Sequence, residues 1–355
     1  MDKNKAIEYI ELSFLSPLLK DEDITDISFN GTDIYYVSNT KGRMKSVVAV
    51  EHQLVKDFLR QVANLSEQQF SFTNPILDIT IGKYRINATH QSIGKIKDED
   101  VVSFSIRIAS CKPKINDDSD FFTPQLIELI KELLINRQSI VIGGLTSSGK
   151  TEFQKYLLRN MRENERIIVI DNVTELDAVR DDQNIDLTCW RVDERNEQSS
   201  APILIKNALR NNPDWLILAE ARDKEMVDVL NSAMTGAPII TTIHSHDAKS
   251  LPFRMGRMVQ RSDQKMDYSE VLADIYYHFH FYIYLTKEET ENKIKRYISE
   301  IGFVDNKGVF TTLYEKKDGE DRYWHLPKEA LDLLKNKNYT ELFKETFIGG
   351  VVNEK

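Results

Sequence analysis

The chain has 355 residues, of which 41% are hydrophobic and 29% charged, the composition of an ordinary globular protein large enough for two domains. Its formal net charge of -9 has the wrong sign for a protein that coats nucleic acid or anionic lipid. Two cysteines, Cys111 and Cys189, are too few for a disulfide framework or a four-thiolate zinc site, which fits a reducing compartment. The N-terminus lacks a signal-peptide pattern and no apolar run approaches the ~18 residues of a spanning helix, so we expect a cytoplasmic protein.

The first third of the chain predicts a small α+β domain over residues 1–110. Two strands joined by an Asn-Gly turn are expected at residues 25–37, and an amphipathic helix at residues 54–62. A hairpin follows at residues 76–88, and a strand of period two at residues 101–109. In the last of these strands Arg107 lies on the face opposite the apolar side chains. Residues 1–115 carry 15 basic and 15 acidic residues, so the rest of the chain, with 32 and 41, holds the whole net charge.

A second domain is predicted over residues 123–355, after a polar linker at residues 111–122. Thr123 is the expected N-cap of its first helix, with Pro124 at the first helical position. Short apolar runs then alternate with segments of helical spacing; the runs are residues 139–142, 166–170, 215–219 and 237–243, and the segments are 152–161, 204–212 and 224–234. This alternation predicts an α/β domain with a mainly parallel sheet. Residues 271–355 predict a C-terminal extension of helix and strand whose elements the pattern does not place.

The segment from Gly144 to Thr151, GLTSSGKT, satisfies G-x-x-x-x-G-K-[ST] between a predicted strand and a predicted helix. In this context backbone N–H groups and a helix N-terminus form an anion site for the α- and β-phosphates of a nucleotide. Lys150 is expected to reach the β- and γ-phosphates, and the Thr151 hydroxyl to hold Mg²⁺. The motif therefore predicts binding of ATP or GTP.

Two of the predicted parallel strands run into carboxylates, at the edge of the sheet where α/β proteins bind ligands. Glu220 is the candidate that polarises a water molecule. Asp214 begins the same strand, about 20 Å away at ~3.3 Å per residue, and cannot share the site. The other strand runs into Asp171 and Glu175, and Asp171 has a second interpretation as the cap of a helix.

His244 ends the last predicted parallel strand, where the side chain either senses the γ-phosphate or has a structural role. The pairs His244/His246 and His278/His280 lack Cys, Asp or Glu at metal-ligand spacing. We therefore expect no metal other than nucleotide-bound Mg²⁺, and no zinc.

The order of these motifs resembles that of the ring-forming ATPases of the type II/type IV secretion superfamily. Their Walker A loop, Asp box, Walker B motif and His box correspond here to GGLTSSGKT, IDNVTEL, ALRNNPDWLILAEAR and TGAPIITTIH. In the first third, TDISFNG, RINA and FSIRI resemble segments of the branch that contains conjugation-type and Tad pilus-assembly ATPases. The strings AD at Ala273-Asp274 and RYISEI near Ile301 extend the likeness weakly. The resemblance implies a RecA-like P-loop ATPase domain that follows the α+β domain.

The resemblance also implies roles for matching positions. The catalytic set is Lys150, Glu175, Glu220, Arg222 and His244 of the second domain, with Arg85 and Arg107 of the first. Glu220 would activate water, and the two arginines of the first domain would reach the phosphates unless they are plain surface residues. The nucleotide-binding set is Gly144, Leu145, Thr146, Ser147, Ser148, Gly149, Lys150, Thr151 and Glu152, and the Mg²⁺ ligands would be Thr151, Asp171 and Glu220.

Three residues depart from the pattern of this superfamily. Ser147 stands where glycine is usual, which predicts a stiffer loop, and Ala219 replaces the glycine of a G-E pair. Asn172 replaces an acidic residue of an E-D pair. This last change removes one charge near the metal and is the one expected to slow hydrolysis.

The function implied is that of a cytoplasmic homohexamer, peripheral to the membrane, that hydrolyses ATP with Mg²⁺. It would energise a secretion, conjugation or pilus-assembly machine, whose inner-membrane components are the expected partners, through movement between its two domains. One alternative is a nucleotide-binding regulator or scaffold with little turnover, which Asn172 favours. The other is a nucleic-acid motor; the acidic balance and the lack of an aromatic-basic stripe argue against direct nucleic-acid binding.

Overall fold

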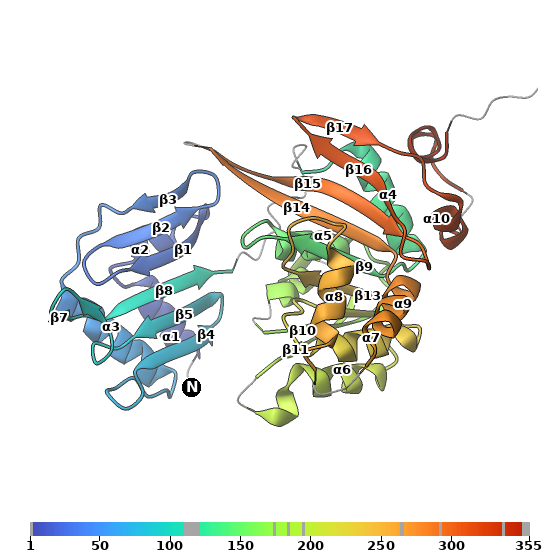
Figure 1. Cartoon of the computed structure of the whole chain (residues 1–355). Helices are drawn as coiled ribbons and strands as arrows, with labels where there is room; N and C mark the ends of the chain where they lie inside the picture. Colours follow the sequence, from blue (N-terminus) through green and yellow to red (C-terminus); the bar gives the residue numbers. More distant parts are fainter. Residues whose placement is uncertain are drawn as a thin grey trace, which may run out of the picture. The chain divides into compact units, whose positions relative to one another are not determined.

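The computed structural model of the chain (Figure 1) describes residues 3–109, 115, 121–172, 175–182, 185–193, 196–262, 266–290, 293–335 and 338–349. The chain divides into two compact units. The first is Met1–Cys111 with Glu288–Lys295, and the second is Lys112–Lys287 with Arg296–Lys355. Cys111 and most of the predicted linker at residues 111–122 lie outside the described residues.

The first unit contains an antiparallel sheet with the strand order β3-β2-β1-β8-β5-β4. The strands are β1 (Ile24–Phe29), β2 (Ile34–Ser38), β3 (Gly42–Lys45), β4 (Ile76–Ile81), β5 (Tyr84–Thr89) and β8 (Ser103–Ile108). Helices α1 (Lys3–Glu11), α2 (Ser16–Leu19) and α3 (His52–Leu65) accompany them, and β6 (Lys95–Ile96) pairs with β7 (Glu99–Asp100) in a short separate ribbon. The α+β fold expected for this part of the chain is confirmed.

One face of this sheet is apolar because successive side chains of a strand point to opposite faces. Ile86 of β5 and Ile106 of β8 are fully buried, and they pack in one cluster with Phe58 and Leu59 of α3. The opposite face is polar and carries the residues of the other parity. Arg85 and Arg107 both lie on it.

The second unit is built on a nine-stranded sheet with the order β11-β10-β12-β13-β9-β14-β15-β16-β17. Its strands are β9 (Ile140–Gly144), β10 (Arg166–Asp171), β11 (Asp186–Arg191), β12 (Trp215–Leu218), β13 (Ile239–Ile243), β14 (Phe281–Thr290), β15 (Lys293–Val304), β16 (Phe310–Lys317) and β17 (Glu320–Tyr323). The strands from β11 through β14 pair in parallel, whereas β15–β16 and β16–β17 pair antiparallel. The predicted mainly parallel sheet is therefore confirmed, and the C-terminal extension supplies its last four strands.

Helices pack against both faces of the larger sheet (Figure 1). The helical segments are α4 (Pro124–Ile135), α5 (Lys150–Arg159), η1 (Glu175–Asp182), η2 (Glu197–Ser199), α6 (Ala201–Leu209), α7 (Met226–Met234), α8 (Leu251–Val259), α9 (Tyr268–His278), α10 (Lys328–Leu333), α11 (Glu341–Phe343) and η3 (Lys344–Ile348). Because β9 is covered on both faces, Ile140 and Ile142 belong to one buried cluster and Val141 to the other. Such a strand needs a continuous apolar run, as the sequence has there.

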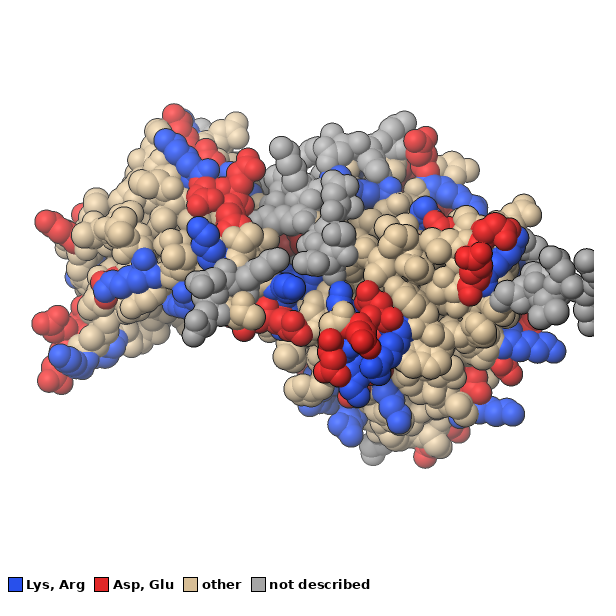
Figure 2. Space-filling view, turned by 90° about the horizontal axis from the view of Figure 1, so that it is seen from above, with Lys and Arg blue, Asp and Glu red and all other residues tan. Residues whose placement is uncertain are grey.

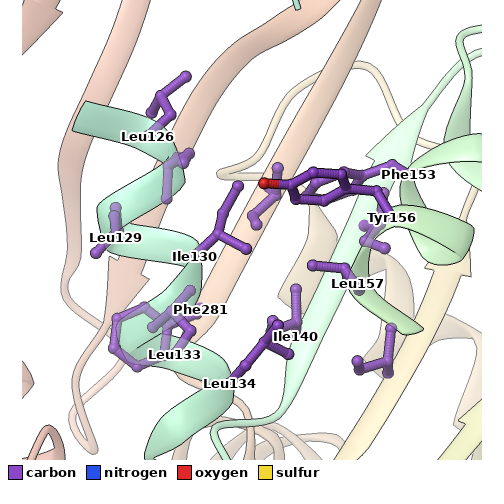
Figure 3. Close-up of a cluster of buried hydrophobic side chains, with 14 of the residues drawn as sticks. Leu126, Leu129, Ile130, Leu133, Leu134, Ile140, Phe153, Tyr156, Leu157 and Phe281 are labelled. Carbon is purple, nitrogen blue, oxygen red and sulfur yellow. The ribbon is translucent and has the colours of Figure 1, made fainter. Parts of the chain in front are cut away.

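The helix that opens the second unit begins where the sequence predicts. The backbone N–H of Leu126 donates to Thr123 Oγ1 at 3.3 Å, and Pro124 occupies the first turn. Helix α4 then packs its apolar stripe over β9 and β14, where Leu133 and Ile130 lie near Ile140 and Phe281 (Figure 3). This packing holds the strand that leads into the glycine-rich loop.

Candidate functional site

The loop between β9 and α5 has a backbone that requires glycine at both ends. A Cβ on Gly144 would lie 2.4 Å from Ser148 Oγ and 2.8 Å from the Leu285 carbonyl oxygen. Gly149 has a φ of +98°, a backbone angle that residues other than glycine rarely adopt. Ser147 also lies in the left-handed region, with a φ of +62°. Serine thus occupies a position whose backbone favours glycine, which gives a physical reason for the usual residue there.

The polar groups of the loop fit a phosphate. Lys150 Nζ donates to the carbonyl oxygens of Gly144 and Leu145, both at 2.9 Å. The Ser148 hydroxyl is buried and has no hydrogen-bond partner among the described residues. A buried ammonium held by its own loop, beside an unpaired hydroxyl at a helix N-terminus, offers the donors that a nucleotide phosphate needs. Bound ATP with Mg²⁺ would supply the phosphoryl group and the charge that neutralises it.

Burial lowers the pKa of Lys150 to about 8, although the nearby Glu220 carboxylate opposes the shift. Only the protonated ammonium attracts a phosphate, so nucleotide binding should draw a proton onto Lys150 above this pKa. We expect the affinity for ADP, measured without Mg²⁺, to be nearly constant below pH 8 and to fall about tenfold per pH unit above it.

Isothermal titration calorimetry in buffers of different ionisation enthalpy would measure both the affinity and the proton uptake. Lys150→Arg is the matched control, because its guanidinium stays protonated and should flatten the pH profile even if affinity drops. If the affinity of wild type for ADP shows no change of slope near pH 8, the expected proton uptake by Lys150 is contradicted.

A second group of side chains lies where β12 and β13 end. Glu220 Oε1 is 2.9 Å from His244 Nε2, and Glu220 Oε2 accepts from Arg222 Nε at 2.9 Å and from its terminal nitrogen at 2.8 Å. His244 Nδ1 lies 3.4 Å from Lys150 Nζ and 3.2 Å from the Gly144 carbonyl oxygen. The predicted residues Lys150, His244 and Glu220 therefore form one chain of contacts across neighbouring segments. With the imidazole proton on Nε2, His244 donates to Glu220 and its Nδ1 is free to accept from Lys150.

The backbone around Glu220 is fixed on both sides. The Ala219 N–H donates to the Ile170 carbonyl, and Thr242 Oγ1 donates to the Ala219 carbonyl at 2.7 Å. The Ala221 N–H donates to the Thr242 carbonyl. Ala219 thus sits between β10 and β13, and these bonds hold the following carboxylate at the carboxyl edge of the sheet.

Opposing effects set the charge of Glu220. Burial alone would raise its pKa, but the hydrogen bonds and charge of Arg222, with His244 and Lys150, lower the pKa below its ordinary value. The carboxylate is therefore ionised at neutral pH, as a group that orients and polarises water must be. Arg222, predicted as part of the catalytic set, is the largest contributor to that lowering.

Asp171 makes the capping contact that its sequence context allowed. Its Oδ2 accepts from the Glu175 N–H at 3.0 Å, so the carboxylate caps η1. It still lies at the carboxyl end of β10, on the same edge of the sheet as Glu220 and the loop that leads to Thr151. Over the parts of the chain that the structure describes, no three His, Cys, Asp or Glu side chains group closely enough to hold a metal ion. The Mg²⁺ ligand set stays a prediction.

Other predicted residues have partners of their own. Glu152 pairs with Lys155, whose ammonium is 2.8 Å away and almost fully buried. In the first unit, Arg107 Nε lies 3.2 Å from Asp26 Oδ1 and Arg85 Nε lies 3.8 Å from Asp78 Oδ1. The two arginines are directly opposite each other on β5 and β8, both with partly exposed side chains.

Burial, with the nearby Asp177, raises the pKa of the Cys189 thiol well above its ordinary value, so this cysteine is inert at neutral pH.

Sequence reasoning missed the side chains that β14 and β15 bring to the site. Arg296 Nε donates to the Ser147 carbonyl oxygen at 2.8 Å, and Glu300 Oε2 accepts from the Ala248 N–H at 2.8 Å. Tyr284 donates to the Ser245 carbonyl at 3.3 Å, so both the glycine-rich loop and the segment after His244 are braced from these strands. Burial raises the pKa of Glu300, against the effect of its hydrogen bond. The string RYISEI contains Arg296 and Glu300, and was the one signal that could have marked them.

Comparison with known proteins finds a family model that matches part of the chain. The family model described as "Type II/IV secretion system protein" matches residues 104–275, which include the four motifs GGLTSSGKT, IDNVTEL, ALRNNPDWLILAEAR and TGAPIITTIH. Over these residues the chain is similar to the type II/type IV secretion ATPase superfamily. The resemblance drawn from the motifs is thus confirmed, and with it the RecA-like character of the larger unit.

Several known proteins match over most of the chain. The uncharacterized protein pXO2-25 of Bacillus anthracis is 28% identical over 304 residues, which cover 82% of this chain and 67% of that protein. The type IV secretion system protein VirB11 of Bartonella quintana is 26% identical over 73% of this chain and 82% of its own. The crystal structure of the ATPase DotB of Legionella pneumophila shares the fold, with a TM-score of 0.59, 17% identity and coverage of 90% of this chain and 82% of that one. Within the described residues, no helix is long and apolar enough to cross a membrane.

Proposed function

We propose that this protein is an ATP-hydrolysing motor that energises a secretion, conjugation or pilus-assembly machine. The observation that carries the proposal is the chain of contacts from Lys150 through His244 to Glu220, with distances of 3.4 and 2.9 Å. It joins a phosphate-binding lysine to an ionised carboxylate that can orient water. Hydrolysis of a phosphoanhydride needs positioning and charge neutralisation more than covalent chemistry, and these groups provide both.

The proposed catalytic roles follow from the chemistry of each group. Lys150 and the loop from Gly144 to Glu152 bind the phosphates, Thr151 holds Mg²⁺, and Glu220 orients the attacking water. His244 reports the presence of the γ-phosphate to Glu220, because it contacts both Lys150 and Glu220. Asp171 and Glu175 flank the metal or the water.

Energy transfer is proposed to depend on the first unit. Arg85 and Arg107, side by side on its polar face, would bind the phosphates in the nucleotide-bound state, as the superfamily resemblance implies. Arginines supplied in this way can accelerate phosphoryl transfer strongly, and they would link hydrolysis to movement of the unit that carries them. We propose a homohexamer at the cytoplasmic face of the membrane, with inner-membrane components of the machine as partners.

The two alternatives predict different behaviour. A nucleotide-binding scaffold, favoured by Asn172, would bind ATP with hardly any turnover. A nucleic-acid motor would be stimulated by DNA. On the face seen in Figure 2, the described basic and acidic side chains are interspersed, without a continuous basic stripe, which does not favour the second alternative.

Steady-state ATPase activity and native mass, measured on the same preparation, test the proposal. We expect turnover without DNA and, with ATP present, a species of six chains of 41.1 kDa each. Arg107→Ala should lower turnover roughly tenfold or more and leave the fold and the mass unchanged. Arg43→Ala, on the same unit at the exposed strand β3, is the matched control.

The outcomes separate the candidates. A monomer without turnover would overturn the motor, and nucleotide binding without turnover would leave the scaffold. Turnover that requires DNA would favour the nucleic-acid motor. Turnover unaffected by Arg107→Ala would remove Arg107 from the site.

A further inference from the structure

Strand β15 contacts the phosphate-binding loop through a side chain that lies outside the four nucleotide-site motifs. The Nε–H of Arg296 donates to the carbonyl oxygen of Ser147 at 2.8 Å, a contact between residues 149 positions apart in the chain. The stem of the same side chain runs past the end of the loop, since a Cβ on Gly149 would lie 3.6 Å from Arg296 Cδ. The guanidinium therefore holds the loop from the side of the C-terminal strands.

The Ser147–Ser148 peptide, whose carbonyl accepts from Arg296, makes a second hydrogen bond on its opposite side. Carbonyl and N–H of a trans peptide point in opposite directions, and the Ser148 N–H donates to the Leu145 carbonyl at 3.3 Å. Lys150 Nζ binds that same Leu145 oxygen. A phosphate that draws Lys150 and the loop N–H groups toward itself must break these internal bonds. The bond from Arg296 lies on the opposite side of the peptide and can persist.

Ser147 is the residue for which such an anchor matters. Its φ of +62° is unfavourable for serine, so a loop without an anchor would relax toward an ordinary backbone conformation. That relaxation would turn the Ser147–Ser148 peptide and misalign the N–H groups that bind an anion. A charged donor on the Ser147 carbonyl opposes it, because hydrogen bonds from ionised groups are the stronger ones.

We propose that Arg296 is a positioning residue for nucleotide binding, which holds the strained Ser147 peptide so that the glycine-rich loop is preformed for phosphate. This inference rests on the proposed function only in that the loop binds a nucleotide. Arg296 acts through the loop backbone and takes no part in the chemical step. It therefore affects nucleotide affinity and KM, and leaves kcat at saturating ATP nearly unchanged.

The test is the affinity for ADP, by calorimetry on the full-length protein, of wild type, Arg296→Gln and Arg296→Lys. We expect Arg296→Gln to bind ADP roughly tenfold more weakly, with KM for ATP raised to a similar extent and kcat within about twofold of wild type. Arg296→Lys, which keeps a charged donor, should recover part of the affinity. Arg322→Gln removes an exposed arginine of β17 paired with Glu320 and should bind ADP like wild type.

A double-mutant cycle with Ser147→Gly identifies the route of the effect. Glycine adopts a positive φ without strain, so the anchor should matter less in that background. We expect Arg296→Gln to cost less than about threefold in ADP affinity when residue 147 is glycine. An undiminished tenfold loss would overturn positioning through the Ser147 peptide, and so would a fall in kcat without a change in KM.

The same measurements separate this inference from the proposed function. If wild type fails to bind ADP, nucleotide binding itself is wrong. If wild type binds, Lys150→Ala does not, and Arg296→Gln binds like wild type, the loop has its expected role and only the positioning role of Arg296 is overturned. Melting temperatures of all variants, measured without nucleotide, show whether a variant has simply lost its fold.

Discussion

Replacing Glu220 with glutamine is expected to lower the kcat of ATP hydrolysis by about 10² to 10⁴-fold while nucleotide affinity stays near that of wild type. The expectation follows from what the side chain does in the site. Its carboxylate is ionised because Arg222, His244 and Lys150 outweigh the effect of burial on its pKa. Glutamine keeps the shape and can still accept a hydrogen bond from Arg222 or His244, but it loses the charge that polarises water.

The comparison with Lys150→Ala separates binding from hydrolysis. Lys150 holds the loop carbonyls in the free protein and is proposed to bind the phosphates, so its loss should abolish both nucleotide binding and turnover. Glu220→Gln should abolish turnover alone and accumulate bound ATP. Single-turnover kinetics with radiolabelled ATP, together with calorimetric affinities, would measure both steps.

Glu163→Gln is the matched control for the carboxylate, because Glu163 is an exposed acid of the second unit outside the site. It should hydrolyse ATP like wild type. If Glu220→Gln also does so, another group activates the water. If wild type hydrolyses ATP as slowly as Glu220→Gln, the protein binds nucleotide without working as a motor. Asn172, which lacks the charge of the usual acidic residue, is then the first residue to replace.

The glycine-rich loop could be located from sequence because its chemistry is local. Eight consecutive residues contain the glycines that its backbone needs, the lysine and the hydroxyl, and the flanking apolar strand identifies the context. The positions of Glu220 and His244 were also predictable, since parallel strands end at the same edge of a sheet. Their direct contact was not, because side-chain distances depend on the order of β12, β13 and β9 in the sheet, which no single strand encodes.

Two roles lay beyond the sequence pattern for other physical reasons. Asp171 had two reasonable interpretations, and its hydrogen bond to the Glu175 N–H is a cap that the spacing of residues allowed but did not require. Arg296 stands on a strand whose pairing is set by tertiary contacts, and its partner Ser147 lies in a different part of the chain. A cation in an alternating, partly charged strand looks like an ordinary surface residue until the fold brings the loop to it.

Stability of the second unit depends on a buried carboxylate at the opposite edge of the sheet from the site. Glu165, whose side chain is 3% exposed, accepts from Arg137 Nε and from the indole Nε1 of Trp215, both at 3.0 Å. The Arg162 N–H donates to it at 3.3 Å. Arg137 also pairs with Asp214, which immediately precedes β12, at 2.9 Å. The carboxylate joins the end of α4 to the beginnings of β10 and β12.

Glu165→Ala is expected to destabilise the second unit by about 3–5 kcal/mol, because it leaves the buried Trp215 N–H without its acceptor and one bond of Arg137 unmade. Glu165→Gln retains an acceptor for the indole and should cost about 1–2 kcal/mol. Urea unfolding followed by tryptophan fluorescence measures this unit alone, since all three tryptophans of the chain lie in it. Glu163→Ala, exposed and two residues away, should stay within about 0.5 kcal/mol of wild type. A loss below about 1 kcal/mol for Glu165→Ala would mean that Arg137 and Trp215 find other partners, and that the carboxylate does not hold the edge of the sheet together.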